Sequence, residues 1–584
     1  MAIFFITNKE SLYTKAKENL SNTDFKISFD YKTEEGIYAL ATHKLTIDNK
    51  NYAVKDNNFC IAVGTCIYSE SLNYSSLLSD YNNNIDVIRE NTIGQYGVCI
   101  KKDSNISFFG DRCGCFNIYY WIGEDGTWIV SSSLFHMVKI LKTNLTFNSF
   151  SIAERAFYKV LLNGRTFFEE IHRLRGTEIL QCDLKKGNTI EIQHVDVAFP
   201  VGSFDEMVEK TVEAYKKNAQ IVSKVLGTPR ICATGGLDSR ILLASFLSVG
   251  VKPNLFYGKG NNIITAPKKE DLIILKKINK KLKLEFELDD FSVSNPLDKD
   301  WNHYIMNNGF RSAYMWGAQR NVINSLCKGE KLLMFGWGGE YLRRSWYNIY
   351  YSPSPSLDSM LSKWHNDYRF RGLANDFPEY KETIKNHFVE ECNYLGINPN
   401  NLSEDDIYLL EIAWGAQADT QIPSFLQQYK YCYLMSFEYN IQRNRVTASE
   451  REAAKFMLTV LYRLYPKLLK EPIFTHEQWV TLDKKKMSLI PYKTSFMKKC
   501  GYKGKRLIRK LTPNFIISDL WYPIKNKMTN KYHENIDTYR PPFELDKIDR
   551  LEHINHMMNI KNIYRDSDRA QYAILCRTLK LLGY

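Results

Sequence analysis

The chain has 584 residues, 44% of them hydrophobic and 24% charged, which is ordinary for a globular protein but too long for one compact core. A prior of about 150 residues per domain predicts roughly two to four folded units. The formal net charge of +13 favours acidic partners, and the 12 cysteines lack the paired CxxC spacing of a zinc site. The longest apolar run, ILLASFLSVGV, is shorter than the about 20 residues that span a bilayer, and the N-terminus lacks a signal-peptide pattern. We therefore expect a cytoplasmic protein without a membrane partner.

Residues 1–200 have the pattern of an antiparallel α+β domain. Short apolar segments alternate there with turn residues, as in NFCIAVGTCIY, QYGVCIKKD, NISFFGD and TWIVSSS. Such runs are typical of strands in an antiparallel sheet, so we expect one α+β unit in this part of the chain.

Residues 201–353 alternate between helix and strand patterns. Ser203 and Glu206 fit a capping box, and an amphipathic helix pattern follows to about Leu226. The run PRICAT predicts a buried strand, and the helix pattern DSRILLASFLSV comes after a glycine turn. Further strands are predicted at KPNLFYG, KLEFELDD and KLLMF, with a helix at EDLIILKKINKKL. This order indicates a doubly wound parallel sheet, in which ligands bind at the carboxyl ends of the strands.

Residues 354–584 are mainly helical by pattern, and the clearest helix is EREAAKFMLTVLYRLYPKLL. The stretch Lys498–Lys510 (KKCGYKGKRLIRK) is strongly basic. We interpret it as a solvated face rather than a dedicated binding patch.

The first glycine turn, ATGGLDSR, follows a predicted strand and opens a helix. Gly235 and Gly236 would let backbone amides approach phosphate oxygens, and the helix N-terminus adds partial positive charge. The turn also offers two hydroxyl donors and a hard oxygen ligand for Mg²⁺, from Thr234, Ser239 and Asp238. A Walker A pattern is absent. The residue types therefore favour phosphate binding over an incidental turn.

The second glycine turn, FGWGGE, follows the predicted strand KLLMF. Its glycines are Gly336, Gly338 and Gly339. Glu340 can ligate Mg²⁺, whereas Trp337 cannot act as a general base at neutral pH. A third turn, at Gly258, ends the strand KPNLFYG.

These turns carry a resemblance to known families. The first resembles the SGGxDS loop of the PP-loop ATP pyrophosphatases, with Thr234 in place of the first Ser. The second resembles the acceptor-side loop SGxGxDE of asparagine synthetases, with Glu340 where that family has Asp. Trp337 stands where asparagine synthetases carry Glu and β-lactam synthetases carry Tyr, which argues against both of those exact reactions. The form GWGGE is closer to the GxGGD variant of lasso-peptide macrolactam synthetases.

Two stretches of the N-terminal region, Gly110–Gly114 (GDRCG) and Tyr119–Tyr120, are similar to the RDRxGxxPLYY segment of class II glutamine amidotransferases. The resemblance implies an Ntn-type, glutaminase-like domain fused to a synthetase. That glutaminase uses an N-terminal Cys as its nucleophile, whereas this chain begins Met1-Ala2. The family's NGE element is replaced by Gly64-Thr65-Cys66. We therefore expect no glutamine hydrolysis.

Taken together, the resemblance implies an ATP- and Mg²⁺-dependent ligase that adenylates a carboxylate and couples it to an amine not supplied by glutamine. Peptide macrolactam formation and amidation in natural product biosynthesis are examples, and a partner protein or leader-peptide carrier fits such chemistry. The implied catalytic residues are Asp238, Arg240, Arg343 and Lys467, and the implied metal ligands are Asp238 and Glu340. The implied nucleotide-binding residues are Thr234, Gly235, Gly236, Asp238, Ser239, Gly258, Gly336, Gly338 and Gly339.

Several neighbours of these residues are secondary candidates. Arg344 lies beside Arg343, and cations there would neutralise a leaving pyrophosphate. Lys470 competes with Lys467 for the place of the family's phosphate-contacting lysine, and each is better explained as a solvated residue at a helix end. Glu270 and Asp271 match an acidic position near the nucleotide, although a helix N-terminus favours acids in any case.

Two other readings stay open. A PP-loop enzyme acting on tRNA would use the basic stretch Lys498–Lys510, but the amidotransferase-like region makes a nucleic acid partner the weaker expectation. A catalytically inactive, synthetase-like scaffold would explain the departures at Thr234, Trp337 and Glu340 and would bind no ATP.

Overall fold

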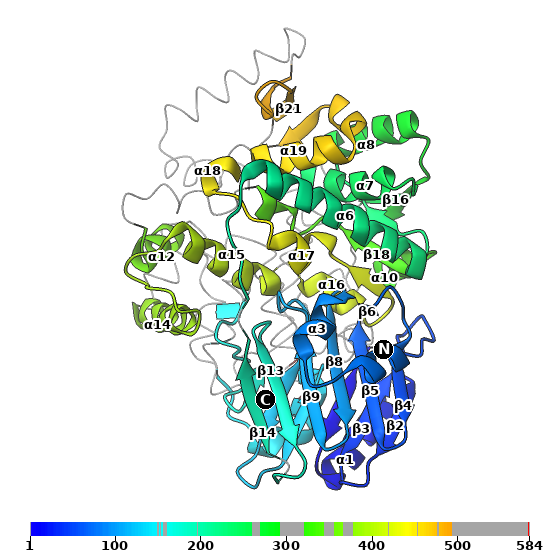
Figure 1. Ribbon diagram of the computed structural model, residues 1–584, viewed down its shortest axis with the longest axis vertical. Coiled ribbons are helices and arrows are strands. Elements are labelled where there is room, and N and C mark those ends of the chain that lie inside the picture. Colours follow the sequence, from blue (N-terminus) through cyan, green and yellow to red (C-terminus); the bar gives the residue numbers. More distant parts are fainter. Residues whose placement is uncertain are drawn as a thin grey trace, which may run out of the picture.

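The computed structural model describes residues 2–148, 151, 154–155, 160–187, 189–195, 197–259, 269–291, 320–343, 355–365, 378–418, 420–451, 454–475, 478–492, 578 and 582. The N-terminal half forms a sheet-rich body at one end, and the helix-rich part lies at the other end (Figure 1). The boundary expected near residue 200 falls between strand β14, which ends at His194, and helix α6, which begins at Phe204.

Two antiparallel sheets, each with six strands, pack face to face in the N-terminal half. The first has the order β12-β10-β11-β1-β3-β2, with β1 (Phe4–Thr7), β2 (Ile27–Lys32), β3 (Tyr38–Thr42), β10 (Tyr119–Ile122), β11 (Trp128–Ser131) and β12 (Ile171–Arg173). The second has the order β14-β13-β9-β8-β5-β4, with β4 (Tyr52–Lys55), β5 (Asn58–Gly64), β8 (Tyr96–Lys102), β9 (Asn105–Gly110), β13 (Glu178–Asp183) and β14 (Ile190–His194). Between the sheets, the rings of Phe108 and Trp128 meet with centroids 5.8 Å apart.

Helices cover the outer face of each sheet. α1 (Glu10–Ser21) and α4 (Leu134–Leu141) pack on the first sheet, and α2 (Tyr74–Asp80) and α3 (Ile85–Glu90) pack on the second. The sequence explains this because successive side chains of a strand point to opposite faces. In β1, for example, Phe4 and Ile6 enter the core between the sheets while Phe5 faces the helices.

The C-terminal half is built on a five-stranded parallel sheet with the order β17-β16-β15-β18-β19. Its strands are β15 (Arg230–Cys232), β16 (Asn254–Lys259), β17 (Phe286–Asp290), β18 (Leu332–Phe335) and β19 (Tyr431–Tyr433). From β15 the chain runs outward through β16 and β17, and then returns to the other side of β15 with β18 and β19. The carboxyl ends of β15 and β18 therefore flank the point where the strand order reverses, which is where doubly wound sheets bind ligands.

Helices cover both faces of this sheet. One face packs on α6 (Phe204–Leu226), α7 (Leu237–Ser248) and α19 (Lys455–Leu464), through residues such as Ile231 and Met334. The other face packs on α10 (Arg320–Cys327) and α16 (Gln421–Leu426), through residues such as Leu333. The doubly wound sheet expected from the alternating pattern is thus present.

Most of the elements predicted for this half are found close to their expected places. α6 spans Phe204–Leu226 as its pattern predicted, and α8 spans Lys269–Leu282. The capping box does not form, because the Ser203 hydroxyl donates to the Glu206 carboxylate at 3.3 Å and caps no backbone amide.

In the described residues after 353 most of the regular structure is helical, but the region also contains strands that the pattern did not predict. It contributes β19 to the parallel sheet, so that sheet crosses the boundary expected at residue 353. It also forms a small antiparallel sheet of β20 (Ile473–Thr475), β21 (Gln478–Asp483) and β22 (Ser488–Pro491). Its described helices include α12 (Leu357–His365), α14 (Pro378–Tyr394), α15 (Glu404–Ala418), α17 (Tyr439–Gln442) and α18 (Ala448–Arg451). The long helix predicted around EREAAKFMLTVLYRLYPKLL is divided, with Ala454 at a φ of +62° directly before α19.

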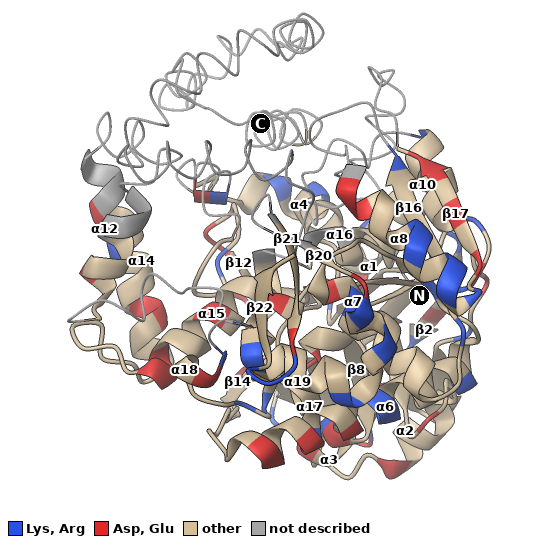
Figure 2. Ribbon diagram, turned by 90° about the horizontal axis from the view of Figure 1, so that it is seen from above, with Lys and Arg blue, Asp and Glu red and all other residues tan. Residues whose placement is uncertain are grey.

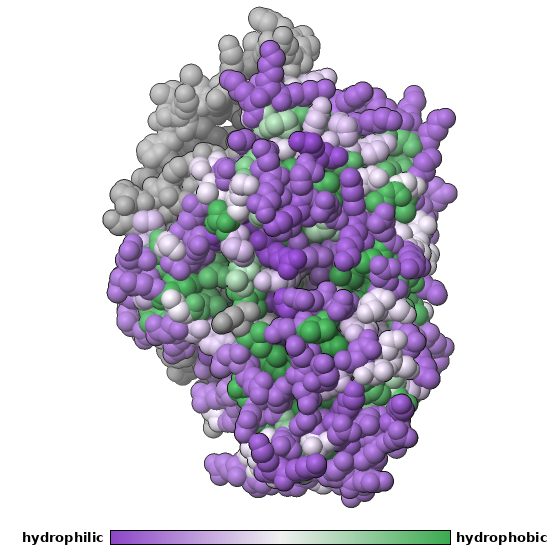
Figure 3. Space-filling model, viewed as in Figure 1, coloured by the Kyte–Doolittle hydropathy of each residue, from purple (hydrophilic) through white to green (hydrophobic). Residues whose placement is uncertain are grey.

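Charged residues of both signs are distributed over the part of the molecule that Figure 2 shows. The face in Figure 3 is mostly hydrophilic, and both signs of charge occur across Figure 2. α8, for example, ends in Lys280 and Lys281, whereas α15 begins with Glu404 and Asp405. Within the described ranges, no helix combines the length and apolar character that crossing a bilayer requires. The basic stretch Lys498–Lys510 lies outside those ranges.

Candidate functional site

The two glycine turns meet at the carboxyl ends of β15 and β18. Their backbones are in such close contact that side chains would not fit between them. A Cβ added to Gly336 would lie 2.6 Å from the carbonyl carbon of Asp238, and one added to Gly339 would lie 2.9 Å from its Oδ1. Glycine is therefore required sterically at Gly336 and favoured at Gly339, and the two turns meet at the same edge of the sheet.

The first turn is held in shape by hydroxyl groups. The Ser239 hydroxyl accepts from the Thr234 amide at 3.1 Å and donates to the Thr234 carbonyl at 2.9 Å. The Thr234 hydroxyl accepts from the Gly236 amide at 3.2 Å. Both hydroxyls, which the sequence suggests as phosphate donors, therefore already make bonds within the turn.

Asp238 and Arg343 connect the first turn to the end of the second. The Arg343 guanidinium donates from Nε to Oδ1 at 3.1 Å and from Nη2 to Oδ2 at 2.9 Å. Burial alone would lower the pKa of Arg343, but the Asp238 carboxylate outweighs it and holds that pKa above its ordinary value. Both side chains stay partly accessible, at 34% for Arg343 and 28% for Asp238, so solvent or a ligand can reach the pair.

Each turn also donates an amide to an acidic side chain. The Gly235 amide donates to Asp271 Oδ1 at 3.0 Å, and the Gly338 amide donates to Glu340 Oε2 at 3.1 Å. Asp271 comes from the first turn of α8, next to Ile274. Of the two acidic residues at the start of α8, Glu270 and Asp271, it is Asp271 that contacts the glycine turn through this hydrogen bond.

Arg240 has a different environment from the one expected of a phosphate-binding residue. Its side chain is buried, and its guanidinium donates to the carbonyls of Gly235, Leu468, Glu471 and Pro472. Burial lowers the pKa of Arg240 to about 10. Direct contact with a phosphate would break these bonds, so the contacts of Arg240 are those of a residue that supports the first turn. It joins the first turn to the 3-10 helix η6 (Pro466–Lys470).

The aromatic residues around the crevice pack on one another. Trp337 stacks on Phe335 with centroids 4.4 Å apart and an interplanar angle of 4°. Gly258 lies against Phe291, since an added Cβ would come within 2.5 Å of that ring. Gly258 therefore leaves room for the ring of Phe291 at the end of β16. Trp337 offers an aromatic ring and no group that could act as a base.

The remaining candidates are placed less centrally. Lys467 and Lys470 are exposed at the two ends of η6, and the Lys467 ammonium lies 5.9 Å from the ring centroid of Tyr465. Arg344 lies outside the described residues. Among the residues described, no three His, Cys, Asp or Glu side chains are grouped to hold a metal. Asp238 and Glu340 do have the hard oxygen donors that Mg²⁺ prefers, one on each turn.

The N-terminal half meets the sheet of the other half through Gly64-Thr65-Cys66 and Gln95. The Thr65 hydroxyl donates to the Cys432 carbonyl at 2.8 Å and accepts from the Cys432 amide at 3.2 Å. The Gln95 carboxamide donates to the Leu434 carbonyl at 3.1 Å and accepts from its amide at 2.8 Å. Sequence reasoning missed Gln95, because an isolated polar residue in a strand-like run gives no signal.

Cys66 is 1% exposed. Burial raises the pKa of its thiol well above the ordinary value, which disfavours the nucleophilic thiolate. Cys113 and Cys115 are likewise buried and form no disulfide. Burial is the main cause of the raised pKa of each thiol. These thiols therefore have the properties of packing residues.

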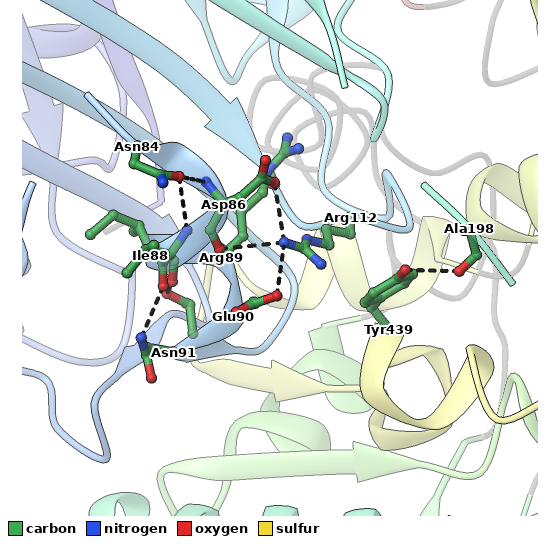
Figure 4. Close-up of polar contacts among 12 residues, drawn as sticks. Asn84, Asp86, Ile88, Arg89, Glu90, Asn91, Arg112, Ala198 and Tyr439 are labelled. Atoms are coloured by element: carbon green, nitrogen blue, oxygen red, sulfur yellow. Dashed lines mark hydrogen bonds and ion pairs between the residues drawn. The ribbon is translucent and has the colours of Figure 1, made fainter. Parts of the chain in front are cut away.

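The stretch Gly110–Gly114 lies at the junction of the two halves. The Asp111 carboxylate accepts from the amides of Cys115 and Phe116, both at 2.9 Å. The Arg112 guanidinium lies between the carboxylates of α3 and the ring of Tyr439 on α17 (Figure 4). Arg112 thus binds Asp86 at 3.1 Å and stacks over Tyr439 at 5.0 Å, across the junction.

Comparisons with known proteins give structural neighbours only. No protein-family model matches the sequence, and no curated protein matches it. A glutamine phosphoribosylpyrophosphate amidotransferase from B. subtilis, solved with ADP and GMP, aligns at 7% identity with a TM-score of 0.23, over 49% of this chain and 90% of that one. A structure described as the allosteric regulatory enzyme of purine biosynthesis aligns at 8% identity with a TM-score of 0.24, over 53% of this chain and 78% of that one.

Proposed function

We propose that the protein is an ATP-dependent amide ligase that activates a carboxylate as its adenylate and transfers the acyl group to an amine. One observation carries this proposal: the two glycine turns touch at the point where the strand order reverses, with Asp238 and Arg343 paired between them. This junction brings together backbone amides, a carboxylate and a guanidinium, which are groups suited to binding a nucleoside triphosphate and its metal ion.

In the first step a carboxylate oxygen of the substrate attacks the α-phosphorus of ATP, and the bond to the β-phosphate breaks, releasing pyrophosphate. Amides of the glycine turns would orient the phosphates, and Arg343 would stabilise the negative charge that develops on the leaving group. Bound Mg²⁺ would supply further charge neutralisation, held by Asp238 and Glu340. In the second step the amine attacks the acyl carbon, loses a proton and releases AMP.

The amine is proposed to come from a source other than glutamine. The segment that stands in the place of the glutaminase NGE element is bonded to the other half of the chain through Thr65, and Cys66 beside it is buried with a raised pKa. Neither is available to hydrolyse an amide in that arrangement. Ring closure within a peptide and coupling of two separate molecules both satisfy this chemistry, with a partner protein or leader-peptide carrier bringing the acid.

The test is ATP–pyrophosphate exchange in the presence of Mg²⁺, with cell extract or candidate acids as the carboxylate source. Wild type is compared with Asp238→Ala and with Asp205→Ala, which removes an acidic residue from the first turn of α6. We expect wild type and Asp205→Ala to exchange at similar rates, and Asp238→Ala to lose the exchange rate by about 100-fold or more. ATP binding without any exchange would indicate an ordered reaction that needs both substrates. No thermal shift with ATP and Mg²⁺ would instead favour the scaffold, since a ligand that binds only the native state stabilises it.

A further inference from the structure

The glycine turns are occupied by the chain's own charged groups. Where a phosphate oxygen would accept from the Gly235 amide, Asp271 Oδ1 accepts at 3.0 Å. Where a divalent cation would be bound by Asp238, the Arg343 guanidinium engages both carboxylate oxygens. An anion therefore sits on the anion-binding amide, and a cation sits on the cation-binding carboxylate.

The first turn and α8 are in close contact at Gly235, whose amide already has Asp271 as its acceptor. A Cβ added to Gly235 would lie 2.6 Å from Asp271 Oδ1 and 2.7 Å from Cδ1 of Ile274. A phosphate oxygen could not accept from the Gly235 amide unless the Asp271 carboxylate moved away. The two negative groups would also repel each other at this distance, because only part of the site is open to solvent.

Arg343 makes the corresponding contact on the cation side. Both oxygens of Asp238 accept from it in a bidentate arrangement, which is the strongest form of a carboxylate–guanidinium contact. A divalent cation that binds Asp238 would have to displace at least one of these bonds. The released guanidinium would then be beside the phosphates, where its charge stabilises them.

We propose that Asp271 and Arg343 hold the Gly235 amide and the Asp238 carboxylate until a nucleotide binds. A nucleotide with its divalent cation then replaces both of these contacts together. The phosphate takes the Gly235 amide and Arg343, while the cation takes Asp238. Metal and phosphate then bind with positive coupling, since each ligand removes a contact that opposes the other. This inference rests on the proposed function, and it adds Asp271 as a residue that sets the affinity of the site for phosphate.

The experiment measures pyrophosphate binding by calorimetry, first with a chelator and then with Mg²⁺. Four proteins are compared: wild type, Asp271→Asn, Asp271→Ala and the control Glu270→Gln. Glu270 precedes Asp271 on the same turn of α8, so Glu270→Gln removes an equal charge nearby without releasing the Gly235 amide. Thermal unfolding without ligand shows whether each variant is folded, and Asp271→Asn keeps the shape of the side chain.

We expect metal-free pyrophosphate to bind Asp271→Asn and Asp271→Ala about tenfold more tightly than wild type, because a charged acceptor no longer competes for the amide. Glu270→Gln should change the affinity by less than about twofold, the effect of a partly screened charge.

Three outcomes would overturn the inference. If wild type binds pyrophosphate and the Asp271 variants bind it no more tightly, Asp271 does not occupy the phosphate position, although the proposed function stands. Equal tightening by Glu270→Gln would reduce the effect to general electrostatics and would also refute it. If none of the four proteins binds pyrophosphate with or without Mg²⁺, the proposed function and the inference fail together.

Discussion

Arg343 and Asp238, which lie 105 residues apart in the sequence, form a bidentate ion pair between the two glycine turns, with contacts of 3.1 and 2.9 Å. The two turns can approach this closely because Gly336 and Gly339 have no side chains, so the backbone of the second turn contacts Asp238 directly. The geometry of the crevice therefore depends on a charged contact and on the absence of side chains at the same time.

The first prediction concerns the shape of the Arg343 side chain. Arg343→Lys should reduce the rate of ATP–pyrophosphate exchange about tenfold, and Arg343→Gln by about 100-fold or more, because lysine keeps the charge but loses the bidentate geometry. Arg463→Lys, an exposed position on α19, serves as the control and should leave the rate unchanged. Equal rates for wild type and Arg343→Gln would show that Arg343 does not act on the leaving group.

The second prediction concerns the stability contributed by Arg240. Arg240→Met should lower the free energy of unfolding by about 2 to 4 kcal/mol, because it leaves buried carbonyl groups without a donor. Urea unfolding followed by tryptophan fluorescence measures the change, and Arg463→Met should cost less than about 1 kcal/mol as an exposed residue. A change in Arg240→Met no larger than in this control would show that the four carbonyl contacts do not support the fold.

The third prediction uses the close approach of the two turns. Gly336→Ala should reduce exchange by about 100-fold, because the new Cβ would push the second turn away from Asp238 and misplace the reacting groups. Gly250→Ala is the control: its φ is +80° and its added Cβ meets nothing within 4 Å. It should cost about 1 kcal/mol in stability through backbone strain while leaving exchange intact. Full activity in Gly336→Ala would mean that the turns are farther apart in the working enzyme.

The fourth prediction is a pH dependence that arises at the junction of the two halves. Burial raises the pKa of the Glu438 carboxyl from 4.5 to about 8, and its Oε1 accepts from the Gly94 amide at 2.7 Å. The folded state thus favours the protonated acid. The stability that this protonation contributes is fully present below the ordinary pKa and is lost as the pH rises through the pKa of the folded state. Wild type should therefore lose stability relative to Glu438→Gln between about pH 5 and about pH 8.

Thermal unfolding of wild type, Glu438→Gln and the control Glu213→Gln across this range would measure the effect. Glu213 is exposed on α6, so its substitution should leave the pH profile parallel to that of wild type. A profile of Glu438→Gln that is also parallel to wild type would show that Glu438 does not stay protonated in the folded protein.

The sequence pattern could predict the positions of the glycine turns because they depend on local features. Glycines after a short apolar run mark a strand end followed by a helix, and β15 and β18 have that form. The place of Arg240 could not be predicted in the same way. It directly follows Ser239 in the turn and looks available to a ligand, but α7 is buried on most of its surface, and three of the four carbonyls that hold Arg240 come from residues more than two hundred positions later.

The region after residue 353 was harder to predict for a related reason. β19 has three residues, Tyr431–Tyr433, which is too short for an alternating pattern to be recognised. Its strand character comes from pairing with β18, so it depends on a partner that is distant in sequence. Asp271 is an intermediate case. The sequence shows an acidic residue near the start of a predicted helix, but only the three-dimensional structure shows its hydrogen bond to Gly235.

The paired hydrogen bonds of Thr65 with Cys432 and of Gln95 with Leu434 have a consequence for dissecting the protein. Both contacts are buried and reciprocal, so separating the halves would strip backbone donors and acceptors of their partners on each exposed face. Fragments cut near residue 200 should therefore aggregate when they are produced singly and dissolve when they are produced in the same cell. Split-reporter reassembly at that cut would then measure the strength of the junction without any knowledge of the substrate.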